Sequence, residues 1–141
     1  MLRELFEKNR SYRRFYQDHA ISISTLRELV ELARLSPSAR NLQPLKYILS
    51  ADPEKNSCIF PNLAWAGYLT DWDGPVEGER PAGYIVILGD SSIEKSIKWD
   101  HSIVSQSMLI GAVEKGLGGC IIGSINRDGL RAALSIPERY E

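Results

Sequence analysis

The sequence predicts a single domain of the α+β class. Three short apolar runs have the composition of strands, and segments with the periodicity of amphipathic helices lie before, between and after them. With 141 residues, of which 43% are hydrophobic, the chain can bury one sizeable core. No repeat, low-complexity tract or linker interrupts residues 1–141, so we expect one domain.

The charge balance excludes several classes of partner. The chain carries 17 Lys and Arg against 18 Asp and Glu, so it has no overall field for nucleic acid or an anionic membrane, and any anion must be held by a local cluster. Charges between Arg3 and Lys8 exclude a secretory signal core, and the longest apolar run, Tyr84–Leu88, is too short to span a bilayer. We therefore expect a cytoplasmic protein that binds neither nucleic acid nor a membrane.

Cysteine and histidine indicate neither a metal site nor a disulfide framework. Cys58 and Cys120 are the only two cysteines and lie far apart, while His19 and His101 have no ligand-like neighbours in the sequence. We interpret all four side chains as ordinary packing or surface residues.

Two helices are predicted at the start of the chain, separated by a basic run. The first is a short amphipathic pattern built on Leu2, Leu5 and Phe6. The second begins after Ser22, which is placed to cap it, and ends near Leu35, ahead of a proline. Its apolar face is formed by Leu26, Leu29, Val30 and Ala33.

The basic run between these helices, Asn9–Arg14, contains three arginines within five residues. No acidic residue lies beside them in the sequence. The run is therefore either a solvated basic loop or a phosphate clamp in which guanidinium groups make charge-assisted hydrogen bonds. The spacing alone does not decide between the two.

The loop Ser36–Pro44 combines stiffness with hydrogen-bonding side chains. Two prolines fix φ and remove backbone donors, and four polar side chains lie between them: Ser38, Arg40, Asn41 and Gln43. Such a loop either holds a ligand or is a helix-to-strand connection whose side chains satisfy only its own backbone.

A strand is predicted at Leu45–Leu49, and Asp52 followed by a proline is typical of the start of another helix. Four apolar side chains then recur at helix-like spacing: Trp65, Tyr68, Leu69 and Trp72. A long polar loop follows and ends near Pro81. Aromatic residues in such a place belong more often to a core or an interface than to a cofactor platform, although this segment is also suited to forming the rim of a pocket.

The second half of the chain has the strongest patterns. Gly83–Gly89 predicts a central strand buried on both faces. A helix over Lys98–Lys115 is apolar on too wide an arc for a half-exposed helix, so we expect it to be buried or in an interface, with Gly116 as a left-handed cap residue. Gly118–Gly123 predicts a second buried strand, and Asn126 begins a final helix that stops before a proline.

Common catalytic patterns are absent. The glycines after position 115 fail the spacing of a dinucleotide-binding loop and follow a helix instead of a strand. A Walker A lysine, a Gly-x-Ser-x-Gly elbow and a Ser/His/Asp set are also missing. The sequence therefore lacks the residues that hydrolytic or metal-dependent catalysis would need. An arginine cluster, an amide-rich loop and glycines beside a buried strand could instead hold a flavin nucleotide.

Three segments together resemble a known family. Asn9–Arg13 with Phe15, the loop Pro37–Pro44, and Ala112–Gly119 are similar, in order and spacing, to the FMN-dependent nitroreductase family, and the similarity covers nearly the whole chain. It implies a three-layer fold, with a mainly antiparallel central sheet flanked by helices, that forms a homodimer. It also implies FMN at the dimer interface, where hydride passes from NAD(P)H to the flavin N5 and on to a small organic acceptor such as a nitroaromatic or a quinone.

The same resemblance assigns the binding residues, while the flavin itself carries the chemistry, so no catalytic side chain is expected. The phosphate, ribityl chain and ring edge would be held by Arg10, Ser11 and Arg13; the partner subunit would contribute Pro37, Ser38, Asn41 and Gln43; and the backbone of Gly119, Cys120, Ile122 and Gly123 would lie along the flavin ring near N5.

The chain departs from the family pattern at three places. Asn9 stands where the family often has a first arginine, and Leu45 where it often has tryptophan. Family members usually continue through another strand and a basic tail that crosses to the partner, whereas this sequence ends at Glu141, so the tail either lies outside this sequence or has been lost. The alternative functions are a non-catalytic flavin-binding or interaction domain and a structural dimer without a cofactor.

Overall fold

The computed structural model describes residues 1–141, which fold into five α-helices, two short 3-10 helices and two strands. In chain order the elements are α1 (Leu2–Lys8), α2 (Ile23–Leu35), η1 (Ala39–Asn41), β1 (Leu45–Ser50), α3 (Pro53–Ile59), η2 (Phe60–Asn62), β2 (Tyr84–Gly89), α4 (Asp100–Glu114) and α5 (Arg127–Leu134). The predicted α+β class is confirmed, with a small antiparallel sheet and helices.

The sheet consists of β1 and β2, paired antiparallel with Leu45 opposite Gly89 and Ser50 opposite Tyr84. The other side of β2 is paired only at its end, where the backbone of Glu141 exchanges two hydrogen bonds of 2.8 Å with Gly89. Most side chains of β2 are only half-buried. The prediction of a strand buried on both faces is therefore wrong for most of its length, because it lacks a neighbour along one edge.

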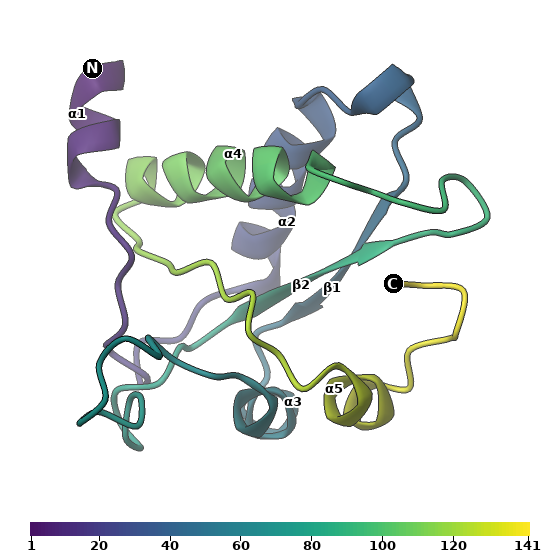
Figure 1. Ribbon diagram of the computed structural model, residues 1–141. Coiled ribbons are helices and arrows are strands. Elements are labelled where there is room, and N and C mark those ends of the chain that lie inside the picture. Colours follow the sequence, from purple (N-terminus) through teal and green to yellow (C-terminus); the bar gives the residue numbers. More distant parts are fainter.

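Helices lie on both sides of the sheet, with α2 and α4 on one side and α3 and α5 on the other (Figure 1). Gly111 allows α2 and α4 to pack closely, because a Cβ at this position would lie 2.2 Å from Leu32 Cδ1. The core cluster comes from α2 and α4, and strand side chains pack against it; its buried members are Leu29, Ala33, Val104, Met108 and Ala112.

Local capping signals predicted the helix ends well. Ser22 Oγ accepts a hydrogen bond from Thr25 N–H at 3.1 Å, and the Asp52 and Asn126 side chains cap α3 and α5 in the same way. Gly116 has φ +73°, and its N–H and that of the next residue donate to carbonyls of the last turn of α4. This is the glycine cap that the sequence predicted.

One further sequence prediction is wrong. Gly118–Gly123 is not a buried strand: it runs as an extended segment whose single backbone bridge joins Gly119 to Ser11, and Ile121 is 56% exposed. A strand needs a continuous neighbour, and this segment has none. The segment Trp65–Trp72, whose apolar side chains recur at helix-like spacing, forms turns and no helix, and its backbone has a positive φ at Ala66.

Apolar side chains remain exposed on two helices. The short α1 buries no residue, and Leu2 and Phe6 are 65% and 50% exposed. On α4, several residues are buried as predicted, while Ile103 is exposed in the single chain, and the predicted alternative of an interface stays a prediction. No helix combines the length and the apolar character that crossing a membrane would require.

Candidate functional site

The structure brings the arginine run and the glycine-rich segment side by side. Ser11 and Gly119 form a parallel bridge, and Tyr12 N–H donates to the Gly119 carbonyl at 3.0 Å. The ring of Tyr12 lies against Gly118, where a Cβ would come within 2.5 Å of the ring carbon Cδ2. Only glycine fits under this ring without a shift, so these two sequence-predicted groups form one continuous surface.

Two of the three arginines have no acidic partner. Arg10 Nη1 donates to the carbonyl oxygens of Phe6 and Asn9, at 3.1 and 2.8 Å, and Arg13 Nη1 donates to the Ser11 carbonyl at 3.2 Å. Neither guanidinium forms an ion pair. Arg14, by contrast, lies 3.7 Å from a carboxylate oxygen of Glu79. The surface therefore carries two positive charges that form no ion pair within the chain.

The backbone beyond Gly119 is open toward solvent. A Cβ at Gly123 would meet no atom within 4 Å, whereas one at Gly119 would lie 2.6 Å from Leu109. Burial raises the pKa of the Cys120 thiol, and the positive charge of Arg13 opposes that rise. The thiol therefore stays protonated at neutral pH and offers the site no charge.

The loop Ser36–Pro44 lies at the other end of α4. Ala39 N–H donates to a carboxylate oxygen of Asp100, in the first turn of that helix, at 3.0 Å. The hydroxyl of Ser36 lies 2.7 Å from that of Ser107 on α4. The first contact fixes Ala39 at the helix end opposite to Gly116, and the second fixes the start of the loop at the middle of the helix.

Within the loop, three residues other than glycine have a left-handed backbone: Arg40, Asn41 and Gln43, with φ of 55°, 55° and 52°. Ser38 Oγ accepts from Gln43 N–H, and Gln43 Nε2 donates to Asn41 Oδ1, both at 3.0 Å. Much of the loop's side-chain hydrogen bonding is therefore satisfied within it. A hollow of about 280 Å³ borders the loop and is lined on its other sides by α2 and β1.

The two predicted halves of the site are not brought together in one chain. α4 has 15 residues, which corresponds to about 22 Å at 1.5 Å per residue. The arginine run and glycine segment lie at its C-terminal end and the Ser36–Pro44 loop at its N-terminal end, as Figure 1 shows for α1 and the segment after α2.

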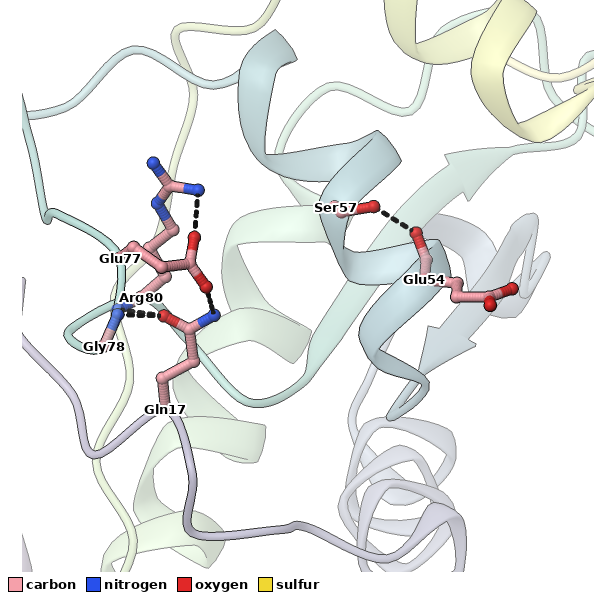
Figure 2. A network of polar contacts seen from close by, with 6 residues as sticks. All are labelled: Gln17, Glu54, Ser57, Glu77, Gly78 and Arg80. Atoms are coloured by element: carbon pink, nitrogen blue, oxygen red, sulfur yellow. Dashed lines mark hydrogen bonds and ion pairs between the residues drawn. The ribbon is translucent and has the colours of Figure 1, made fainter.

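A polar network that the sequence did not predict lies beside the arginine run (Figure 2). Gln17 Nε2 donates to Glu77 at 2.6 Å, and Gln17 Oε1 accepts from the backbone N–H of Gly78 at 2.7 Å. Oε1 also accepts from Arg80 N–H at 3.2 Å, and the Arg80 guanidinium returns to Glu77 at 2.7 Å. No local pattern indicates it, because its members are sixty residues apart.

This network anchors the chain just after the segment Trp65–Trp72, called the aromatic segment below. At the other end, Ala64 N–H donates to the Ser124 carbonyl at 3.0 Å, one residue beyond Gly123. The segment is thus tied to both walls of the surface, and between its anchors Tyr68 is 71% exposed with Arg13 5.6 Å from the centre of its ring. The predicted rim position is consistent with this placement. No group of three or more His, Cys, Asp or Glu side chains is placed to hold a metal ion.

Comparisons with known proteins agree on one family. The sequence profile described as the nitroreductase family matches residues 7–141. Among solved structures, a nitroreductase family protein from Clostridium novyi superposes with a TM-score of 0.78 at 23% identity, over 100% of this chain and 79% of the other. No curated protein sequence matches the chain.

Two further structures connect this fold with FMN. An FMN-dependent nitroreductase from Clostridium difficile superposes with a TM-score of 0.67 at 25% identity, over 97% of this chain and 80% of the other. A nitroreductase from Exiguobacterium sibiricum, in complex with FMN, gives a TM-score of 0.79 at 18% identity, over 99% and 82%.

Proposed function

The chain belongs to the nitroreductase family of FMN flavoproteins, and on this premise we propose that it is a homodimeric oxidoreductase. In this proposal it acts by a ping-pong mechanism. NAD(P)H reduces the flavin, which then reduces a small organic acceptor such as a nitroaromatic or a quinone. The observation that carries the proposal is the unpaired Arg10 and Arg13 beside the open backbone that begins at Gly119, within a chain that matches the family over residues 7–141.

The chemistry of the donors fits FMN. Two guanidinium groups and the exposed hydroxyl of Ser11 provide the donors that a phosphate and a ribityl chain accept, without relying on net charge. Gly123 has free space where a side chain would stand, which suits a flat ring. We therefore assign Arg10, Ser11 and Arg13 to the phosphate, ribityl chain and ring edge, and the backbone of Gly119, Cys120, Ile122 and Gly123 to the ring.

A second copy of the chain would complete the site. In one chain the two groups lie toward opposite ends of α4, a helix about 22 Å long, so we propose that one chain does not cover a ligand with both. In a two-fold dimer with antiparallel α4 helices, the N-terminal end of one α4 lies beside the C-terminal end of the other. Pro37, Ser38, Asn41 and Gln43 of one copy would then face the arginine run of the other.

Exposed apolar surface supports this arrangement. Leu2 and Phe6 on α1 and Ile103 on α4 lie on the two helices that such a pairing would cover. Large apolar side chains on neighbouring helices are the usual core of an obligate interface. We propose that α1 and α4 are buried between the two copies.

The division of labour follows from the residues present. Bound FMN supplies the N5 position that accepts a hydride and passes it on. The arginines neutralise the phosphate and fix its position, the open backbone supports the ring without a side chain in the way, and the loop excludes water from the opposite side. None of these steps requires a side chain as general base.

The first experiment is spectroscopic. The purified full-length protein should be yellow, release FMN on denaturation, and lose its visible absorption when NADH or NADPH is added without air. A protein that retains FMN but is not reduced would instead be the non-catalytic flavin-binding domain. A colourless protein that ignores added FMN would contradict the proposal outright.

A further inference from the structure

Asp100 is a buried carboxylate with a contact outside its own helix. It stands in the first turn of α4 and is only 2% exposed. Its Oδ1 accepts the hydrogen bond from Ala39 N–H at 3.0 Å. A carboxylate needed only to favour the positive end of a helix would serve equally well in water, so burial against the loop indicates an additional role.

The part of the loop that Asp100 holds has a backbone conformation that residues other than glycine do not adopt readily. Ala39 is followed at once by Arg40 and Asn41, and Gln43 is close behind, all three with positive φ. Left-handed backbone is unfavourable for residues with a Cβ and persists only where the surroundings impose it. The bonds among Ser38, Asn41 and Gln43 lie within the loop, so they do not fix it to the rest of the molecule.

We propose that Asp100 is a positioning residue whose carboxylate holds the Ala39–Gln43 turn in the shape that presents Ser38, Asn41 and Gln43 to the flavin of the neighbouring subunit. The holding of the turn follows from the contacts above, and the presentation to flavin rests on the proposed function. Asp100 touches neither flavin nor substrate in this scheme and acts only through the loop.

The bond can be removed from either side. Asp100→Ala removes the acceptor. Ala39→Pro removes the donor, and Ser38, with φ −127° and ψ 158°, already has the extended backbone that a following proline requires. Asp100→Asn is the conservative variant, because its amide oxygen still accepts the bond. Asp90→Asn is the matched control: Asp90 is equally buried, but its carboxylate contacts Ser92 and Arg139 instead of the loop.

The first measurement is independent of flavin. Amide hydrogen exchange of residues 38–43 and tryptic cleavage after Arg40 should both become about tenfold faster or more in Asp100→Ala and in Ala39→Pro, the loss expected for one hydrogen bond to a charged group. The double variant should be no faster than either single variant. Asp100→Asn and Asp90→Asn should stay near the unmodified protein. Unchanged exchange in Asp100→Ala and Ala39→Pro would overturn the proposal.

The second measurement uses FMN as the probe. The dissociation constant of FMN should rise about tenfold or more in Asp100→Ala and be restored in Asp100→Asn, which a general loss of stability would not produce. A released loop with unchanged FMN affinity would overturn the presentation to flavin. If the unmodified protein does not bind FMN at all, the proposed function fails, while faster exchange in the two variants would still support Asp100 as the residue that holds the loop.

Discussion

The two ends of α4 carry polar segments of opposite character. At the C-terminal end, Arg10 and Arg13 have no acidic partner and lie beside an open backbone that begins at Gly119. At the N-terminal end, the Ser36–Pro44 loop makes hydrogen bonds between its own residues, and the buried Asp100 accepts a hydrogen bond from its backbone. The first surface has positive charges without acidic partners, whereas the polar side chains of the second have hydrogen-bond partners within the loop.

In the proposed dimer, this difference decides which half of the shared site can be recognised in one chain. Guanidinium groups without a carboxylate partner are free to bind an anion, so the arginine end can be proposed as a binding surface from one chain. The loop end is recognisable only by its strained backbone, because its side chains find partners within the loop. A site divided between two subunits can thus have one half that looks functional and one that looks structural.

Removing both unpaired arginines tests the first half and carries the largest expected effect. Charge-assisted hydrogen bonds contribute about 1.5–3 kcal/mol each, so Arg10→Ala with Arg13→Ala should weaken FMN binding by roughly 10² to 10⁴-fold. Fluorescence titration of FMN gives the affinity. Arg14→Ala is the matched control, because that arginine already lies near Glu79 and should change the affinity much less. Equal losses in the two proteins would mean that unpaired charge does not mark the site.

Gln17 tests whether the arginine end depends on distant anchoring. Its side chain makes three of the hydrogen bonds in the network of Figure 2, two of them to backbone amides. Gln17→Ala should lower the free energy of unfolding by about 1–3 kcal/mol, measured by urea denaturation. Tyr16→Ala, at an 85% exposed neighbour, should change it by less than about 0.5 kcal/mol. A Gln17 variant as stable as the Tyr16 variant would show that the network contributes nothing to the fold.

The helix ends that the sequence predicted correctly are those fixed by neighbouring residues. The Ser22 cap, the Asp52 cap and the glycine cap at Gly116 each depend on atoms within about one helical turn. Gly118–Gly123 was predicted wrongly because whether an extended segment becomes a buried strand depends on which segments lie beside it. Here only Ser11 does.

The candidate site could be proposed from the sequence to the same extent. The arginine run and the polar loop are visible as composition, and the structure places Ser11 beside Gly119, whereas the role of these residues in binding flavin stays a prediction. Asp100 could not be selected from the sequence, because an acidic residue at a helix start is common and its burial is a tertiary property. Gln17 had no local signal at all, since Glu77 and Gly78 are brought to it by the fold.

The left-handed residues at the two ends of α4 should respond to substitution with opposite signs. Gly116 has open space around its missing side chain, so Gly116→Ala introduces only an unfavourable φ and should lower the free energy of unfolding by about 1 kcal/mol. Arg40→Gly removes an unfavourable φ from an exposed residue and should raise it by up to about 1 kcal/mol. Thermal denaturation of both variants measures the two changes in stability. Destabilisation by Arg40→Gly would show that the loop is not strained.

Asp90 carries the smallest expected effect. Its backbone N–H donates to the Pro44 carbonyl at the base of the loop, at 2.8 Å, and Asp90→Asn leaves this bond in place and changes only the carboxylate. Hydrogen bonds from the Ser92 hydroxyl and amide, with the charges of Arg139 and Lys46, lower the pKa of its carboxyl below the ordinary 3.8, and burial opposes this only in part. The ionised form therefore stabilises the folded chain above the ordinary pKa, and this stabilisation is lost as the pH falls through the lower value of the folded state.

Asp90→Asn should accordingly melt below the unmodified protein at pH 7, and the gap should narrow in melts taken progressively below about pH 4. The chain leaves Arg10 and Arg13 without any carboxylate partner, so Arg10→Ala with Arg13→Ala should shift the melting temperature by an amount that does not depend on acid in this range. An acid-independent gap for Asp90→Asn would mean that the charge of Asp90 does not stabilise the folded chain.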